Sequence, residues 1–222
     1  MTEQNKKGLP DILIMTSVEA EKEALERGLN GFERFKVALT GVGPAKAAAR
    51  TATELATHSY QYVINAGIAG GFKELAPVTS IVVANEVVAA DLGSESEEGF
   101  LPVDELGLGQ AAIQTAQPFS ANLEQKLSEM DETVTLAPIL TLATVTGTSE
   151  TTGELQQRFP HAAAEAMEGH GVATAAELAG IPVLEVRAIS NEIGPRNREA
   201  WKIKEALQAL ERVGRALTEV FS

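Results

Sequence analysis

Short apolar runs alternate along the chain with segments whose apolar residues recur at helical spacing. The apolar runs, each predicted to form a strand, cover residues 11–17, 35–43, 62–71, 80–90, 137–147 and 181–190. The helical patterns cover residues 19–29, 45–58, 151–159 and 172–180. Such alternation is typical of a parallel or mixed sheet covered by helices on both faces. It predicts the α/β class, as a single-domain three-layer α/β/α architecture with a central mixed sheet.

The last segment, residues 198–221, predicts a closing amphipathic helix. Its apolar positions are Trp201, Ile203, Ala206, Leu207, Leu210 and Val213. Residues three and four positions apart fall on one side of a helix, so this side is expected to pack against the rest of the protein.

Residues 90–109, ADLGSESEEGFLPVDELGLG, follow neither period and predict a long ordered loop. The apolar residues expected to pack it down are Leu92, Phe100, Leu101, Val103, Leu106 and Leu108. Long loops in compact domains are often functional. Two interpretations therefore stay open, a lid over a binding site and a plain surface excursion.

Composition limits the classes of function. The 222 residues are 44% apolar, enough for one buried core, which we expect over residues 11–222 behind a disordered lead of residues 1–10. The net charge of −13 and the pI near 4.7 argue against nucleic acids or anionic membranes as partners, because both require a cationic surface.

The chain contains no cysteine, and its three histidines, His58, His161 and His170, are scattered. The sequence therefore predicts no metal site. The first ten residues, MTEQNKKGLP, lack the apolar core of a signal peptide, and no apolar run is long enough to cross a membrane. Both observations predict a cytoplasmic protein.

Two glycine-rich turns follow predicted strands, TGVGPAKAAA at residues 40–49 and NAGIAGGF at residues 65–72. Glycine lets backbone N–H groups approach a ligand closely, and open α/β sheets bind ligands beyond the carboxyl ends of their strands. Neither turn has the P-loop or Rossmann pattern. Each could be an ordinary strand-to-helix turn, but two in consecutive units favour a ligand crevice.

Several acidic and polar residues lie at the ends of the predicted elements. Glu19, Glu21 and Glu23 begin the 19–29 helix, where carboxylates complement the helix dipole. One of them, facing the crevice, would instead be a general base. The Met167–Glu168 pair and the Ser190–Asn191 pair are further candidates for the site. A structural role is the alternative, because a methionine often packs in the core and a glutamate at a helix terminus often interacts with the helix dipole.

The order of these motifs resembles the nucleoside phosphorylase and nucleosidase superfamily. The matching features are Glu19 to Glu21, GVG at 41–43, NAGIAGG at 65–71, the Met167–Glu168 pair and RAISN at 187–191. Within that superfamily, residues 82–107, 143–152, 166–171 and 190–201 resemble the futalosine hydrolase family. The resemblance covers nearly the whole chain and includes the aperiodic loop.

This resemblance implies a nucleoside phosphorylase-like fold and a hydrolase of N-glycosidic bonds. The implied reaction cleaves futalosine to hypoxanthine and dehypoxanthine futalosine in menaquinone biosynthesis. It needs no cofactor, and family members typically form dimers or higher homo-oligomers. Alternatives are a purine nucleoside phosphorylase, a methylthioadenosine/adenosylhomocysteine-type nucleosidase and, in another class, a non-catalytic purine-binding protein. No arginine adjoins either glycine turn, which favours water over phosphate as the attacking group.

The resemblance also implies roles for individual residues. Glu21 matches the carboxylate that polarises the attacking water, with Glu19 as the alternative, and Glu168 matches the carboxylate that binds the ribose hydroxyls. Other residues expected to line the substrate are Val42, Ala69, Gly70, Met167 and Ser190.

Asn191 departs from the adenine-specific nucleosidases, which carry an aspartic acid at this position. An amide cannot transfer a proton to the leaving base. It can donate its NH2 to N7 or O6 while its carbonyl accepts a base N–H, a pattern that suits a 6-oxopurine. The sequence therefore predicts a preference for hypoxanthine over adenine as the leaving base.

Futalosine also carries a benzoate, which requires a cation or backbone donors. Arg196 and Arg198, just beyond Asn191, are candidates for its carboxylate, and Phe100 is a candidate for its ring. A solvated surface position is the alternative for both arginines.

Overall fold

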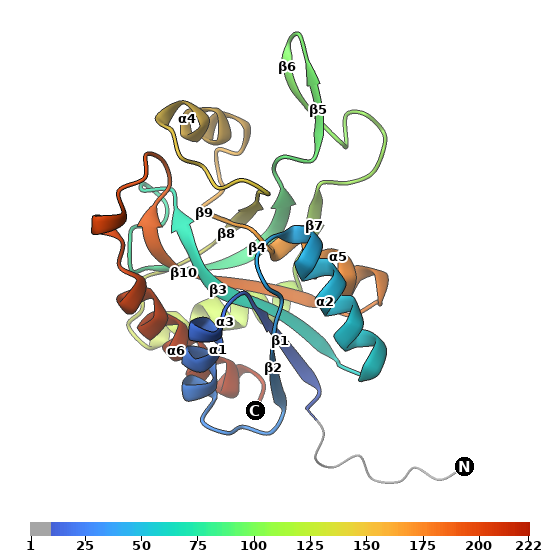
Figure 1. The fold of residues 1–222 in the computed structure, drawn as a ribbon. Helices are drawn as coiled ribbons and strands as arrows, with labels where there is room; N and C mark the ends of the chain where they lie inside the picture. The colour runs from blue at the N-terminus through green and yellow to red at the C-terminus, as the bar shows by residue number, and fades with distance from the viewer. Residues whose placement is uncertain (1–9) are drawn as a thin grey trace.

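The computed structural model describes residues 10–222, which form a central sheet with helices on both faces (Figure 1). The strands of this mixed sheet are β1 (Ile12–Thr16), β2 (Phe35–Leu39), β3 (Tyr62–Gly71), β4 (Ile81–Ala89), β7 (Ala112–Gln114), β8 (Val134–Thr141), β9 (Ala164–Ala166) and β10 (Val183–Glu192). Their order is β10-β4-β8-β9-β3-β1-β2, with β7 against β4. The expected α/β class with a mixed central sheet is confirmed.

The sheet closes on itself because β10 also pairs with β3, in parallel. Strands β10, β4, β8, β9 and β3 therefore form a ring, and β1 and β2 extend the sheet from β3. The ring brings β9 and β10 to opposite sides of the same strand, although they are separated in sequence by a helix.

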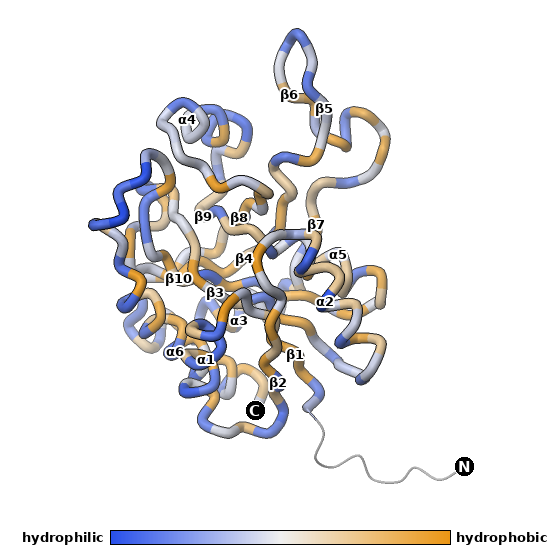
Figure 2. The backbone as a smooth tube through the Cα atoms, viewed as in Figure 1, coloured by the Kyte–Doolittle hydropathy of each residue, from blue (hydrophilic) through white to orange (hydrophobic). Residues whose placement is uncertain are grey.

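Two helical layers cover the sheet. One contains α1 (Glu19–Leu29), α3 (Gln117–Glu129) and α6 (Ile203–Val220), and the other contains α2 (Pro44–Thr57) and α5 (Gly169–Leu178). In β1, Ile12 and Ile14 join the core under the first layer, whereas Leu13 and Met15 join the core under the second. A strand buried on both faces has a continuous apolar sequence, which explains the runs that predict strands. Figure 2 shows the same hydrophobic centre.

The closing amphipathic helix is confirmed, but it begins at Ile203 rather than near residue 198. Ala206, Leu210, Val213 and Leu217 are buried along its inner face. Residues Arg198–Ala200 form a single 3-10 turn, η1, and Trp201 precedes the helix.

Residues 90–109 differ from the prediction of a loop without secondary structure. They contain a two-stranded hairpin, β5 (Gly93–Ser96) and β6 (Gly99–Pro102), which projects from the body with a hydrophilic tip (Figures 1 and 2). The expectation that Leu92, Leu106 and Leu108 pack down is wrong, because they are 43%, 36% and 77% exposed. Phe100 is half-buried, with the Arg158 guanidinium 3.9 Å from its ring centre.

Besides the hairpin strands, the sequence prediction lacks α3, β7 and β9. Two of these are strands of three residues, too short to show a period, and α3 has a weakly amphipathic sequence that starts at Gln117 and Pro118. The expected disordered lead falls, except for Pro10, outside the described residues. No helix between residues 10 and 222 is long and apolar enough to cross a membrane, and the cytoplasmic location stays a prediction.

Candidate active site

Glu21 lies at the carboxyl end of β1, in the first turn of α1, and is only 3% exposed. Its Oε2 accepts hydrogen bonds from the Thr16 hydroxyl at 3.0 Å and from the backbone N–H groups of Ser17 at 2.9 Å and Val18 at 3.1 Å. Its Oε1 accepts one, from the Ile68 N–H of β3, at 2.8 Å. Glu21 therefore caps α1 with one oxygen and presents the other to the end of β3.

Glu19 points away from this region. Its side chain is 59% exposed and pairs with Lys22 at 3.3 Å. The two glutamates that the sequence left as alternatives are thus separated by the structure, and only Glu21 reaches β3.

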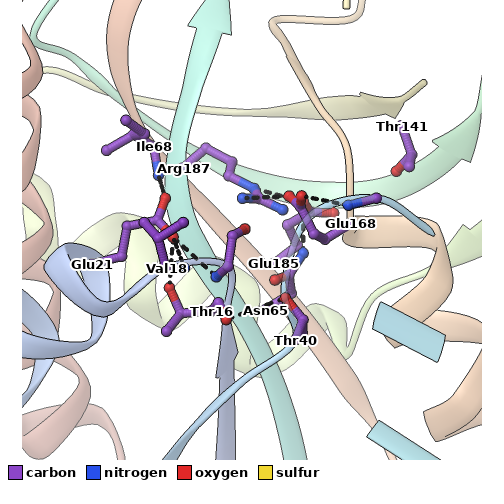
Figure 3. A network of polar contacts seen from close by, with 12 residues as sticks. Thr16, Val18, Glu21, Thr40, Asn65, Ile68, Thr141, Glu168, Glu185 and Arg187 are labelled. Atoms are coloured by element: carbon purple, nitrogen blue, oxygen red, sulfur yellow. Dashed lines mark hydrogen bonds and ion pairs between the residues drawn. The ribbon is translucent and has the colours of Figure 1, made fainter. Parts of the chain in front are cut away.

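A fully buried arginine, Arg187 of β10, joins the acidic residues (Figure 3). Its Nε donates to Glu185 Oε1 at 2.8 Å, and its Nη1 lies 3.6 Å from Glu168 Oε2. Asn65 donates to the same Glu185 oxygen at 3.2 Å. Glu185 and Arg187 are two positions apart on one strand, so both side chains point to the same face of the sheet.

Gly67 allows this cluster to reach Glu21. A Cβ at Gly67 would lie 2.7 Å from Glu21 Oε1 and 2.8 Å from Arg187 Nη1. Both atoms therefore occupy the space above the glycine, where no side chain would fit. The Glu21 oxygen and the Arg187 guanidinium meet over β3 because Gly67 has no side chain.

The charges in the cluster depend on one another. Burial raises the pKa of Glu185, an effect that Arg187 opposes. Burial alone would lower the pKa of Arg187, but Glu185, Glu168 and Glu21 raise it above its ordinary value. A buried cation among several carboxylates stays charged, and removing it would leave uncompensated negative charge.

Glu168 directly precedes α5 and is 4% exposed. Its Oε1 accepts a hydrogen bond at 3.1 Å from the N–H of Gly43, at the start of α2. Val42, the neighbour of Gly43, is 53% exposed, and Met167 beside Glu168 is half-buried. The glycine turn at 41–43 therefore contributes a backbone donor to the same cluster.

Ser190 and Asn191 lie at a bulge near the end of β10, where the pairing with β3 shifts between Ile189 and Asn191. The Ser190 hydroxyl is buried and lies 3.2 Å from the Ala69 carbonyl and 2.8 Å from Asn191 Oδ1. The Asn191 amide nitrogen donates to the Glu192 carbonyl at 3.0 Å. Ser190 therefore orients the amide so that its NH2 group lies away from the hydroxyl.

A cavity of about 90 Å³ lies beside Asn191. Its lining consists of Gly70, Val145, Thr146, Glu165, Asn191, Glu192, Ile193, Gly194, Arg196 and Trp201. A second cavity of about 280 Å³ shares Asn191, Glu192, Ile193 and Trp201 with it. The hollows lie at the carboxyl ends of β3 and β10, where α/β sheets bind ligands. The Glu21–Glu168 cluster lies beside the middle of the same two strands and at the carboxyl end of the shorter β1.

A larger cavity, of about 670 Å³, lies at the opposite end of the sheet, around Asp11, Arg34 and Tyr60. Its arginine is already paired with Asp11 at 2.9 Å. Since it holds none of the carboxylates that converge on β3, size alone does not locate the site.

The structure gathers most of the expected residues into two groups along β3 and β10. Glu21 and Glu168 meet Arg187, while Gly70, Asn191 and Arg196 line the small cavity. Ala69 and Ser190 are buried next to Gly70 and Asn191 in the chain, and the Ser190 hydroxyl contacts the Ala69 carbonyl.

Phe100 is an exception, because it packs against Arg158 and is not part of either cavity beside Asn191. The sequence interpretation also assigns no role in the site to Arg187, Glu185, Glu165 and Trp201. Charged residues within the otherwise apolar run IPVLEVRAIS were the available signal for Glu185 and Arg187. In the described part of the chain, no group of three or more acidic or histidine residues is arranged to hold a metal ion.

Known proteins resemble this chain in sequence and in fold. The family model described as "Phosphorylase superfamily" matches residues 16–222. A futalosine hydrolase from Streptomyces coelicolor is 43% identical over 90% of this chain and 91% of its own length. The chain belongs to the phosphorylase superfamily and, within it, to the futalosine hydrolase family.

Two further matches support this membership. A futalosine hydrolase from Acidothermus cellulolyticus is 41% identical over 92% of this chain and 89% of its own length. The native structure of futalosine hydrolase from Helicobacter pylori superposes with a TM-score of 0.83, covering 95% of this chain and 98% of that one. At 17% sequence identity, the latter similarity concerns the fold.

Proposed function

We propose that this protein hydrolyses the N-glycosidic bond of futalosine, releasing hypoxanthine and dehypoxanthine futalosine in menaquinone biosynthesis. The observation that carries the proposal is the meeting of Glu21 and Arg187 over Gly67 of β3, with Glu168 in contact with Arg187, next to β10, the strand that carries both Arg187 and Asn191. Futalosine hydrolases more than 40% identical over most of the chain support the choice of substrate.

Cleavage of a purine nucleoside places positive charge on the ribose and negative charge on the base in the transition state. Carboxylates near the sugar stabilise the first, and hydrogen-bond donors near the base stabilise the second. Glu168 is the proposed ribose ligand. A carboxylate oxygen can accept more than one hydrogen bond. Among residues 10–222, Glu21 Oε1 accepts that of Ile68 alone, which leaves capacity for the attacking water.

Arg187 has a proposed positioning role. Glu168 and Glu21 are both buried, and both carboxylates lie close to the Arg187 guanidinium. The guanidinium compensates the repulsion between Glu21 and Glu168, and it orients the Glu168 carboxylate through its contact with Oε2. The same arginine stabilises the Glu185 carboxylate. By accepting the hydrogen bond of Arg187 Nε, Glu185 fixes the orientation of the guanidinium.

Asn191 is the proposed contact to the leaving base. One hydrogen of its NH2 group is engaged by Glu192, and the other is free to donate to N7 or O6. A neutral amide stabilises the departing hypoxanthine anion by hydrogen bonding without protonating it. This chemistry supports a 6-oxopurine substrate over an adenine nucleoside.

The benzoate tail of futalosine needs a separate contact. Arg196 borders the cavity at Asn191, is exposed to solvent and lies 5.5 Å from the Trp201 ring centre. We propose it as the carboxylate ligand, with Trp201 rather than Phe100 nearest to it. Replacement Arg196→Gln is expected to raise KM for futalosine about tenfold or more, the usual scale for a charge-assisted hydrogen bond, with no change for inosine. Arg198→Gln is the matched control.

The deciding experiment is product chromatography of the purified protein with futalosine, with and without phosphate. Release of hypoxanthine without phosphate is the expected result. Release that requires phosphate would identify a phosphorylase, and no release would identify a binding protein. A panel that adds aminofutalosine, inosine and methylthioadenosine tests the base and the tail in the same assay.

A homo-oligomer of two or more chains is also part of the proposal. Val18, Leu39 and Val42 are 42%, 38% and 53% exposed at the carboxyl ends of β1 and β2, next to the cluster. A neighbouring subunit covering them would remove this apolar surface from water. Light scattering after size-exclusion chromatography tests this, with Val42→Glu expected to weaken the assembly.

A further inference from the structure

Glu185 is a fully buried glutamate in the middle of β10, and its carboxylate has two different groups of neighbours. On one side, Oε1 accepts hydrogen bonds from Arg187 Nε at 2.8 Å and from the Asn65 side chain of β3 at 3.2 Å. On the other side, both oxygens lie against Gly169. The side chain therefore lies between the buried arginine and the residue that directly follows Glu168.

Gly169, the first residue of α5, fits against this carboxylate because it has no side chain. A Cβ at Gly169 would lie 2.2 Å from Glu185 Oε2 and 2.5 Å from Oε1, well inside contact distance. The first turn of a helix carries the positive end of its dipole, so a carboxylate there also stabilises the start of α5. Glu185 therefore determines how closely the first turn of α5 approaches β10.

The position of Glu168 depends on where α5 begins, because Glu168 is the residue directly before this helix. Its carboxylate meets the Gly43 N–H at 3.1 Å and Arg187 Nη1 at 3.6 Å. The second distance is longer than a direct hydrogen bond. The backbone at the start of α5 must therefore contribute to placing the carboxylate. Figure 3 shows the side chains of Glu185, Arg187 and Glu168 together.

The guanidinium of Arg187 is held by the same two carboxylates. Its Nε donates to Glu185 and its Nη1 faces Glu168, whereas Nη2 has no hydrogen-bond partner among residues 10–222. The bond to Glu185 is the short, charge-assisted one, so it selects the orientation of the arginine. Without this bond, the guanidinium would no longer be fixed opposite Glu168.

We propose that Glu185 is a positioning residue for the ribose. It fixes Arg187 on one side and the start of α5 on the other, and both contacts determine where Glu168 meets the sugar. This inference rests on the proposed function, in which Glu168 is the ribose ligand. Glu185 is fully buried and acts only through these neighbours. Recognition of the ribose should therefore depend on Glu185, whereas recognition of the free base should not.

The first test is the variant Glu185→Gln, assayed by kcat/KM for futalosine. Glutamine keeps the shape of the side chain but loses the charge that binds Arg187. We expect kcat/KM to fall about tenfold or more, the usual scale for a charge-assisted hydrogen bond. Glu177→Gln, at an exposed position of the same helix α5, is the matched control and should leave kcat/KM unchanged. An unchanged kcat/KM in Glu185→Gln would overturn the proposal.

Ligand binding separates positioning from a general loss of structure. The probe is formycin B, an inosine analogue whose base is joined to the ribose through carbon, so that it is not hydrolysed. By calorimetry, Glu185→Gln is expected to weaken formycin B binding about tenfold and to leave the binding of hypoxanthine, which has no ribose, unchanged. A purely structural role would weaken the binding of both ligands by the same factor, and this result would overturn the proposal.

Gly169→Ala tests the contact with α5. The added Cβ would displace the Glu185 carboxylate, so kcat/KM for futalosine is expected to fall about tenfold or more. Both changes act through the same carboxylate. The double variant with Glu185→Gln should therefore be about as active as the less active single variant. Losses that multiply in the double variant would contradict the link between Glu185 and α5.

The proposed function and the role of Glu185 can fail separately. A wild-type protein that binds formycin B but releases no hypoxanthine from futalosine contradicts the proposed function alone. Release of hypoxanthine by the wild type, with equal affinities of the wild type and Glu185→Gln for formycin B, contradicts the role of Glu185 alone.

Discussion

Replacing Arg187 by methionine removes the one cation that contacts Glu185 and Glu168 within the described cluster. Arg187 and Glu185 are 1% and 0% exposed, so water cannot replace the lost contact. Removing one partner of a buried ion pair typically costs about 3–5 kcal/mol of unfolding free energy. For a chain of this size, each kcal/mol lowers Tm by about 2–4 °C, which gives an expected decrease of about 6–20 °C.

A double variant distinguishes lost charge compensation from lost packing. In Arg187→Met combined with Glu185→Gln, the uncompensated carboxylate becomes a neutral amide of the same shape. We expect the double variant to be more stable than Arg187→Met alone by at least about 1 kcal/mol, within the usual range of coupling between contacting residues. Urea unfolding followed by circular dichroism measures all members of the cycle.

The control is Arg50→Met, at an exposed position of α2. A change within about 0.5 kcal/mol is expected there. The reasoning fails if Arg187→Met is as stable as the wild type, or if adding Glu185→Gln to it destabilises the protein further.

Three further changes test the site. Glu21→Gln is expected to lower kcat by about 10²–10⁴-fold, whereas Glu19→Gln leaves it unchanged; equal losses in a hydrolysis assay would refute the assignment. Gly67→Ala would place a Cβ 2.7 Å from Glu21 Oε1 and should lower kcat/KM strongly, whereas Gly153→Ala, with nothing within 4 Å, should keep kcat/KM and gain stability. Because burial raises the pKa of Glu165, its contribution to stability falls as pH rises above the ordinary carboxyl range. The Tm advantage of Glu165→Gln over the wild type should therefore be larger at pH 7 than at pH 4, and a constant difference would contradict this.

The sequence by itself determined the elements whose signals are local. Strand β1 is apolar on both faces and α6 is apolar on one, so each shows its period within its own residues. Glu21 is similar, since its capping contacts with Thr16, Ser17 and Val18 lie within five positions along the chain. The motif order also led to the correct family. Short strands such as β9 have no measurable period. The hairpin at 93–102 lies in a segment rich in glycine and acidic residues, a composition that does not indicate strands.

Only the tertiary structure decided which of these residues meet. Glu168 contacts Arg187 from another element, and Gly70 pairs with both Glu165 and Asn191 because the sheet closes between β3 and β10. Strand pairing between distant segments depends on the register and on the packing of the whole core, which local periodicity does not contain. Burial likewise appears only in the folded chain. It distinguishes Glu21 from Glu19 and encloses Glu165, which no cation contacts within residues 10–222, because water is removed from a side chain by neighbours that are remote in sequence.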